Sequence, residues 1–157
     1  MKKNPARNVY LKKRPSKLLE KINSSIDIDS RLYKEDIQGS IAHATMLIKT
    51  NIISSKEGRK IIVSLKEILQ NIEKGKVRFD KKYEDIHMNV EALLQKKIGS
   101  LAGKLHTARS RNDQVVTDFK IWIKKHIIQI DLDCKKFQNA LIDIAKKNIY
   151  SVMPGYT

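Results

Sequence analysis

The chain has 157 residues, enough for one domain with a hydrophobic core. Its hydrophobic content of 41% and charged content of 31% exclude a chain that is disordered throughout. A single cysteine, Cys134, excludes a disulfide framework, and no group of Cys and His has the spacing of a zinc site. The basic N-terminus lacks an apolar leader core and no apolar run is long enough to span a membrane, so we expect a cytoplasmic protein with no membrane partner.

The formal net charge of +15 suggests nucleic acid or an anionic surface as a partner. However, only seven of the 32 basic residues are arginine, the lysines are spread along the chain, and aromatic residues make up 6%. Proteins that read phosphates and bases usually cluster arginines and interleave aromatic side chains. We therefore interpret most of the charge as solvated surface and keep nucleic acid as an alternative partner for the basic N-terminal segment alone.

The first half of the chain predicts short helices separated by turns. Residues 1–15 have no periodicity and form a predicted basic arm, after which Ser16 can cap a short helix. The turn-forming run Asn23-Ser24-Ser25 interrupts this pattern. From about 28 to 49 the apolar residues follow a helical period with one broad apolar face, and Asn51 is a plausible stop.

Two further helices carry clear end signals. Ser54 with Glu57 three residues later is a capping-box pattern, and Gly75 is placed to end the helix that Ser54 begins. The pair Glu84-Asp85 puts two acids in the first turn of the next predicted helix, where they favour the helix dipole. That helix ends at Gly99, and a loop follows it.

The longest predicted element is a helix from about 113 to 148. Its apolar residues recur at steps of three and four, and further apolar residues widen the stripe onto a second face. A helix of that kind needs partners along its length, which the shorter helices before it cannot all supply. We therefore expect an all-α fold in which this helix is the first of a larger bundle.

The run His106-Thr107-Ala108-Arg109-Ser110-Arg111-Asn112-Asp113-Gln114 precedes this helix and combines two guanidiniums, two hydroxyls and two carboxamides. Such donors at a helix N-terminus indicate recognition of carboxylates or phosphates. A structural interpretation stays open: Ser110 can be the helix cap, and Arg109 and Arg111 can pair with nearby acids. Packing or solvated roles are the simpler interpretation of His43, His106 and His126.

Three stretches of the chain resemble argininosuccinate lyase, of the fumarase/aspartase superfamily. They are Asn23–Ser40 (NSSIDIDSRLYKEDIQGS), Glu84–Asp118 (EDIHMNVEALLQKKIGSLAGKLHTARSRNDQVVTD) and Met153–Thr157 (MPGYT). The middle stretch is too long and too mixed in composition to arise from helix periodicity. The resemblance implies a helical N-terminal lyase domain over 16–109 and the start of a central helical bundle over 110–157.

The resemblance also implies an activity: the reversible β-elimination of argininosuccinate to arginine and fumarate in arginine biosynthesis, without metal or organic cofactor. By residue-wise resemblance Ser25, Asn112 and Thr157 match substrate contacts of the family, and Arg111 lies beside them as a bidentate fork. His87, in the family's EDIH stretch, is a further candidate near the substrate. Four subunits are expected to join their bundles into a homotetramer.

The chain also departs from the family pattern. The usual Trp-Gly-Gly-Arg-Phe-like segment is absent near the start, and Ala108 stands where many members have glycine, which is a small change unless the backbone there needs positive φ. The family's catalytic histidine and serine would follow Thr157, so we expect no catalytic residue in this chain and no activity from it alone. The alternative function is a non-catalytic remnant or basic binding module for nucleic acid or protein.

Overall fold

The computed structural model describes residues 18 and 22–155, so the predicted arm 1–15, the cap at Ser16 and the candidate Thr157 lie outside the described residues. Contacts divide the chain into two compact units, Met1–Asp118 and Phe119–Thr157. Every regular element among the described residues is a helix, which confirms the predicted all-α fold. The predicted division between residues 109 and 110 remains a prediction about domain organisation.

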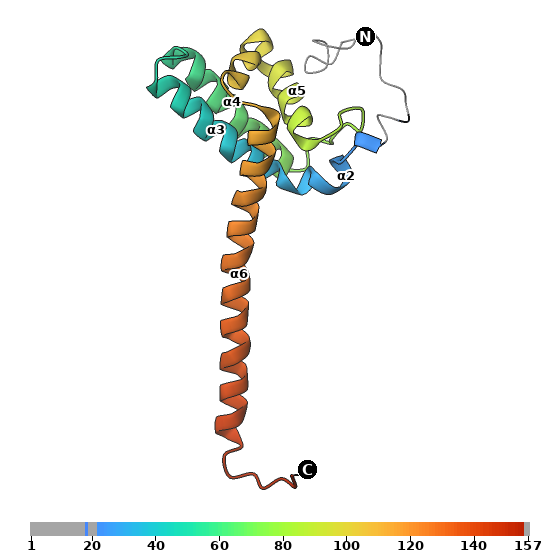
Figure 1. Ribbon diagram of the computed structural model, residues 1–157, viewed down its shortest axis with the longest axis vertical. Coiled ribbons are helices and arrows are strands. Elements are labelled where there is room, and N and C mark those ends of the chain that lie inside the picture. Colours follow the sequence, from blue (N-terminus) through green and yellow to red (C-terminus); the bar gives the residue numbers. More distant parts are fainter. Residues whose placement is uncertain (1–17, 19–21, 156–157) are drawn as a thin grey trace. The chain divides into compact units, whose positions relative to one another are not determined.

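The first unit is a small helical assembly built around three helices (Figure 1). Its elements, in chain order, are α2 (Ile26–Asp29), the 3₁₀ helix η2 (Ser30–Leu32), α3 (Tyr33–Lys49), α4 (Ser55–Glu73), α5 (Ile86–Ile98), the 3₁₀ helix η3 (Gly99–His106) and the first turns of α6 (Arg111–Lys147). The core joins apolar side chains of α3, α4, α5 and η3, with Ile37, Leu47, Ile61, Leu65 and Leu94 almost completely buried.

The structure divides the helix predicted from 28 to 49 into α2, η2 and α3. The division lies where Asp29 bonds to other segments: its carboxylate accepts from Ser25 Oγ at 2.5 Å and from the Ile86 backbone N–H at 3.1 Å. The Ser25 backbone N–H also donates to the Glu84 carbonyl oxygen at 2.8 Å. The start of α2 is therefore joined to the start of α5.

The predicted helix ends are largely confirmed. Ser54 and Glu57 form the capping box of α4, and Gly75, with φ of +67°, follows its end. Asp85 is the cap of α5 rather than a first-turn residue, because its carboxylate accepts from the Met88 backbone N–H at 2.6 Å. Gly99, with φ of +66°, ends α5 as predicted, whereas the loop expected after it is the 3₁₀ helix η3.

A glycine near the start of α4 allows α3 and α4 to approach closely. A Cβ placed on Gly58 would lie 2.2 Å from Cγ1 of Ile48 in α3, a distance that real Cβ atoms do not show. The absence of a side chain here therefore sets how closely the two helices pack, because any larger residue must displace Ile48.

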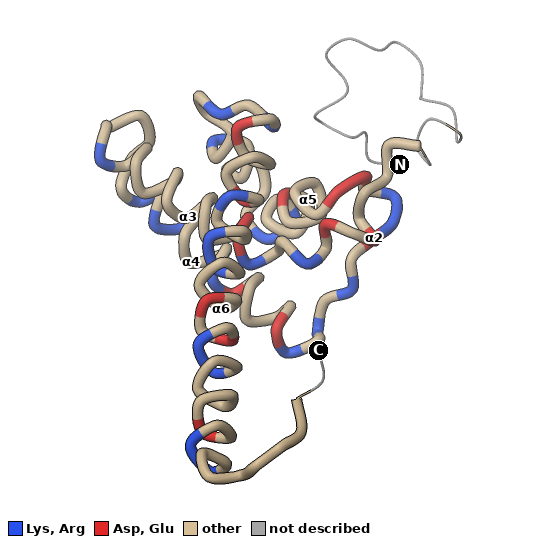
Figure 2. Tube along the Cα trace, turned by 60° about the horizontal axis from the view of Figure 1, so that its bottom comes forward, with Lys and Arg blue, Asp and Glu red and all other residues tan. Residues whose placement is uncertain are grey.

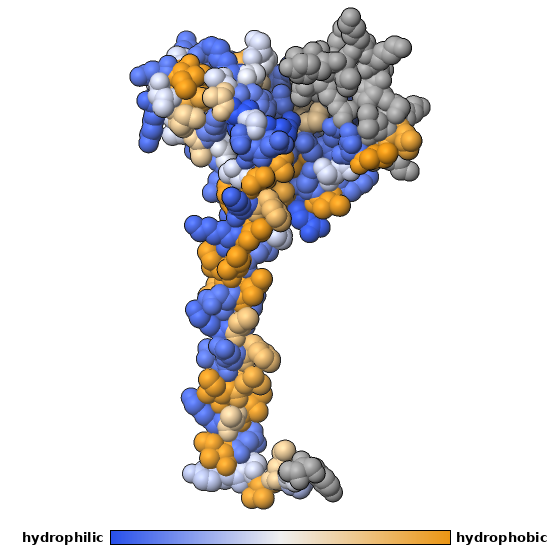
Figure 3. All heavy atoms as spheres, in the orientation of Figure 1, coloured by the Kyte–Doolittle hydropathy of each residue, from blue (hydrophilic) through white to orange (hydrophobic). Residues whose placement is uncertain are grey.

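The second unit continues α6 to Lys147 and ends in an irregular segment. Figure 3 shows apolar and polar side chains alternating along this part of the helix. Its large apolar side chains are half or more exposed at several positions, including Phe119, Ile127, Ile130, Phe137 and Ile144. Within the described residues, no helix combines the length and apolar character that crossing a membrane requires.

Lysine and arginine residues are distributed over several helices, together with aspartate and glutamate, as Figure 2 shows. Some of these charges form exposed ion pairs, such as Lys34 with Glu73 at 3.1 Å and Lys135 with Asp131 at 2.8 Å. Exposed pairs of this kind contribute little to stability. The distribution agrees with the interpretation of the charge as solvated surface.

Candidate functional site

The run from His106 to Gln114 forms a short connection followed by the first turn of α6. Ser110 caps this helix: its Oγ accepts from the Asp113 backbone N–H at 3.1 Å and donates to the Asp113 carboxylate at 2.7 Å. Ala108 has φ of +56°, in the left-handed region that favours glycine. The backbone at Ala108 therefore does need a positive φ, so alanine is a costly replacement for glycine at this position.

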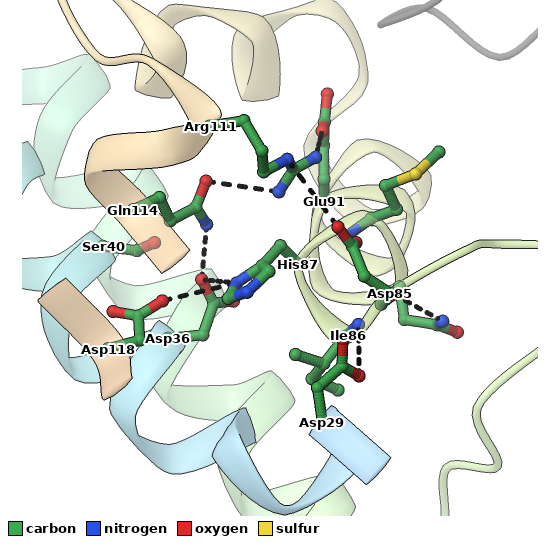
Figure 4. Close-up of polar contacts among 12 residues, drawn as sticks. Asp29, Asp36, Ser40, Asp85, Ile86, His87, Glu91, Arg111, Gln114 and Asp118 are labelled. Atoms are coloured by element: carbon green, nitrogen blue, oxygen red, sulfur yellow. Dashed lines mark hydrogen bonds and ion pairs between the residues drawn. The ribbon is translucent and has the colours of Figure 1, made fainter. Parts of the chain in front are cut away.

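Arg111 lies at the start of α6 and reaches toward acids of α5 (Figure 4). Its guanidinium lies 3.9 Å from the Asp85 carboxylate and 3.5 Å from the Glu91 carboxylate, and Nη1 donates to Oε1 of Gln114 at 3.2 Å. The side chain is half-buried. The structural alternative, in which Arg111 pairs with nearby acids, therefore describes its contacts in the structure, and an anion that binds Arg111 would compete with those acids.

The other predicted substrate contacts have different surroundings. The Ser25 backbone N–H donates to the Glu84 carbonyl, which places Ser25 beside the start of α5. The Ser25 hydroxyl donates to the Asp29 carboxylate. Asn112 is exposed in the first turn of α6. Ser25 and Arg111 therefore both lie near the N-terminal end of α5.

His87 is only 2% exposed and belongs to what we term the buried cluster, made of Asp36 from α3, His87 from α5 and Asp118 from α6. His87 Nδ1 lies 3.0 Å from Oδ1 of Asp36 and 3.3 Å from Oδ2 of Asp118 (Figure 4). The two carboxyls are each 1% exposed. His87 thus contacts acids of its own chain, and the role near a substrate that resemblance implies remains a prediction.

Two residues of the His106–Gln114 run contact the buried cluster and its surroundings. The Gln114 side-chain amide donates a short hydrogen bond to Oδ1 of Asp36. Arg109 donates from Nη1 to Oγ of Ser40 at 3.1 Å, while its buried Nε has no partner. Arg109 and Gln114 therefore join the run to buried residues of α3, while Ser110 caps α6 at the exposed side of the run.

The close approach of α6 to α3 depends on a glycine. A Cβ on Gly39 would lie 2.8 Å from Oδ1 of Asp118. Because Gly39 has no side chain, the carboxyl of Asp118 can enter the space between the helices and reach His87 and Asp36.

The pKa values of all three residues of the buried cluster are shifted. Burial, followed by the negative charge of Asp36, raises the pKa of Asp118 to about 7. Burial also opposes ionisation of Asp36, but hydrogen bonds from His87 and Gln114 outweigh it and lower the pKa of Asp36. For His87, burial disfavours the charged form, yet the bond to Asp36 and the surrounding acids raise its pKa.

A cavity of about 10 Å³ adjoins the buried cluster and is lined by Asp36, Ser40, His87, Glu91, Arg109 and Gln114, among others. This is room for about one water molecule. Asp36 and Arg109 both line this cavity, and Oδ2 of Asp36 and Nε of Arg109 are buried without hydrogen-bond partners.

The buried cluster is better described as a hydrogen-bonded group than as a cation site. Its ligand-type atoms lie within 4.8 Å of one another, a separation that a metal ion could bridge. However, the Gln114 amide already donates to Asp36, and the positive charge of Arg109 acts on both carboxyls. These donors compensate the carboxyls without a metal, so we assign no metal ligand here.

The sequence patterns did not identify Asp36, Gln114 and Asp118 as parts of this site. One signal was available in α3, where Asp36, Ser40 and Ala44 follow each other at four-residue steps on the face that Ile37 and Leu47 bury. A polar residue on the apolar face of a helix requires a partner. The identity of that partner, on a helix 78 residues further on, does not follow from the spacing.

Comparison with known proteins agrees with this description. A family model described as lyase matches residues 10–157, which is most of the chain. The chain therefore belongs to this lyase family.

Within the family, the resemblance to argininosuccinate lyases is confirmed. The chain is 55% identical over 140 residues to "Argininosuccinate lyase" of Desulforamulus reducens, covering 89% of this chain and 30% of the relative. It is 49% identical over 155 residues to the protein of the same name from Ehrlichia chaffeensis, and 48% identical to that of Ehrlichia canis, each match covering 99% of this chain and 33% of the relative. The chain thus spans about a third of the length of the curated relatives it matches.

Proposed function

We propose that this chain provides part of the substrate site of an argininosuccinate lyase, which cleaves argininosuccinate reversibly into arginine and fumarate. The observation that carries the proposal is the meeting of Arg111 with Asp85 and Glu91 beside the segment of Ser25. Argininosuccinate has both carboxylates and a guanidino group. A site that places a guanidinium next to two partly buried carboxylates is suited to a substrate of mixed charge.

The proposed reaction is a β-elimination in which a base removes a proton from carbon and an acid assists the leaving nitrogen. The intermediate gains negative charge on a carboxylate, so preorganised donors around that group lower the barrier. We assign recognition of that carboxylate to Arg111, Asn112, Ser25 and Thr157. His87, which is buried, is proposed to lie near the substrate. We assign no proton-transferring group to the described residues, and the chain spans about a third of the length of its relatives.

Complementation tests this proposal directly. The purified chain is mixed with a recombinant segment of the Desulforamulus reducens relative that starts after the aligned region, and fumarate release from argininosuccinate is followed by its ultraviolet absorbance. We expect turnover from the mixture, little from either part alone, and a loss of at least about tenfold with Arg111→Gln. Lys124→Gln, at an exposed position on α6, is the matched control. A well-folded mixture without turnover would contradict the proposal.

The exposed apolar side chains of the second unit support a further part of the proposal, a homotetramer in which α6 is covered by helices of other subunits. The cytoplasmic location expected from the sequence also remains part of this proposal. A binding module for nucleic acid is not favoured, because the basic residues are dispersed among acids over several helices.

A further inference from the structure

A continuous chain of polar contacts leads from Asp118 to Arg111. Asp118 lies 3.3 Å from His87 Nδ1, which lies 3.0 Å from Asp36. Asp36 accepts a hydrogen bond from the amide nitrogen of Gln114. The amide oxygen of Gln114 accepts from Arg111 at 3.2 Å, which completes the path from the interior to the half-buried guanidinium (Figure 4).

The buried cluster has fewer donors than its oxygens require. The His87 Nδ1–H can serve only one oxygen well, and Asp36 Oδ1 is the nearer of the two. Oδ2 of Asp36 and Oδ2 of Asp118 are both buried without a hydrogen-bond donor. Two adjacent carboxylates that both ionise in such a place repel each other, whereas one shared proton relieves the repulsion and supplies the missing donor.

The charge balance of the buried cluster also indicates that it holds one proton. With both carboxyls ionised, His87 neutral and Arg109 positive, Asp36, His87, Asp118 and Arg109 together carry one net negative charge; Asp118 and His87, whose pKa values are both raised, are the two groups that can hold the balancing proton. One added proton makes the four residues together neutral, and burial favours that state. The raised pKa of Asp118, about 7, agrees with a proton that is held at neutral pH.

We propose that Asp118 is a positioning residue for Arg111, and that it acts by holding one proton in the buried cluster. While the proton is held, Gln114 donates to Asp36 and presents its oxygen to Arg111. When the proton is lost, the region near Arg111 gains a negative charge, which disfavours an incoming anion and changes the electrostatic surroundings of the Arg111 guanidinium. The inference rests on the proposed function only in the role of Arg111 as an anion fork.

Other titratable groups face this region and must be separated from Asp118. They are Asp85 and Glu91 on α5, His106 in η3, and Arg109 before α6. His106 is the main competitor, because its Nε2 lies 3.1 Å from the Glu91 carboxylate that also approaches Arg111. A variant that removes the His106 side chain is therefore the control for this second route to Arg111, which runs through Glu91.

Nuclear magnetic resonance of the full chain between pH 5 and 9 tests the inference without any substrate. We expect the Asp118 carboxyl carbon and the Arg111 Nε–H to shift with a common midpoint near pH 7. In Asp118→Asn, which keeps the shape and a donor but cannot titrate, the Arg111 shift should disappear. In the matched control His106→Gln it should remain.

A third variant tests the path itself. Gln114→Met keeps the length of the side chain and removes both hydrogen bonds, so Asp118 should still titrate while Arg111 no longer responds. The inference is overturned if Arg111 is unaffected by pH in the unaltered chain, or if its shift persists in Asp118→Asn, whatever happens in His106→Gln. Because no turnover is measured, failure of the complementation assay leaves this result standing, and an active lyase with an unresponsive Arg111 would refute the inference alone.

Discussion

At the scale of single residues, Ala108 has an unfavourable backbone conformation. Its φ of +56° is easily adopted by glycine and costs an alanine about 1 kcal/mol through contact of Cβ with the backbone. The strain lies in the run that carries Arg109, Arg111 and Asn112. The surrounding contacts therefore impose this conformation on the segment.

Ala108→Gly should increase the free energy of unfolding by up to about 0.5 kcal/mol, because relief of the strain exceeds the added freedom of the unfolded chain. Urea unfolding followed by circular dichroism measures the change. Ala42→Gly, at an exposed position in α3, is the matched control and should lower the free energy of unfolding by about 1 kcal/mol. Equal losses in both variants would show that Ala108 is unstrained.

The raised pKa of Asp118 also predicts how stability depends on pH. Its folded-state pKa of about 7 exceeds the ordinary value of 3.8, so the folded chain keeps a proton between these values that the unfolded chain releases. The free energy of unfolding should therefore fall as pH rises from about 4 to 7. The raised pKa of His87 acts in the same direction, since its contribution is lost as pH rises through its folded-state pKa.

Asp118→Asn should flatten this profile, changing the difference in unfolding free energy between pH 4.5 and 8 by about 1 to 3 kcal/mol. Urea unfolding at several pH values in this range measures it. Starting at pH 4.5 keeps the measurement above the lowered pKa of Asp36, whose contribution is lost only in more acid solution. Asp143→Asn, at an exposed site, should leave the slope unchanged, and an unchanged slope in Asp118→Asn would contradict the assignment.

At the scale of elements, the sequence predicted helices where local signals are strong. Ser54, Glu57, Gly75 and Gly99 define helix ends through their own backbone and side-chain preferences, and the structure has those ends. The 3₁₀ turn between α2 and α3 could not be predicted, because it accompanies bonds from Asp29 to α5, 57 residues further along the chain.

The candidate site shows the same limit. The His106–Gln114 run could be predicted as an anion site because all its donors are neighbours in sequence. The contact of Gln114 with Asp36 spans 78 residues and depends on how α3 and α6 pack, so no local pattern contains it.

Gly58→Ala tests the close packing of α3 and α4. Alanine is the better helix former, but its Cβ would overlap Ile48, so we expect a loss of about 1 to 3 kcal/mol in the free energy of unfolding. Gly103→Ala, where no atom lies within 4 Å of the added Cβ, is the matched control and should change stability little. In an Ile48→Ala background the penalty of Gly58→Ala should shrink, and an unchanged penalty would show that the contact is not the cause.

At the scale of the whole molecule, the two units differ in how they are stabilised. The first has a buried core, while the second exposes many of the apolar side chains of α6. Exposed apolar faces of this extent promote association, because burying them removes apolar surface from water.

We expect the purified chain to associate in a concentration-dependent way that sedimentation velocity can follow. Replacing Ile127, Ile130 and Phe137 together by glutamine should shift the distribution toward monomer, because these three follow steps of three and seven on one side of the helix. The matched control replaces Lys120, Lys124 and Lys146 by glutamine and should leave association intact. A wild-type chain that remains monomeric at high concentration would contradict the expectation.

The position of Gln114 between Asp36 and Arg111 restricts which amino acid can occupy it. The amide nitrogen faces a carboxylate and the amide oxygen faces a guanidinium, so a flipped amide would oppose acceptor to acceptor and donor to donor. Glutamate would suit the arginine but repel the aspartate, lysine would do the reverse, and asparagine is one methylene shorter. Glutamine has the length to join the aspartate to the arginine, and it is uncharged, with a donor at one atom and an acceptor at the other. Selection at this position would therefore preserve an uncharged side chain whose donor faces Asp36 and whose acceptor faces Arg111.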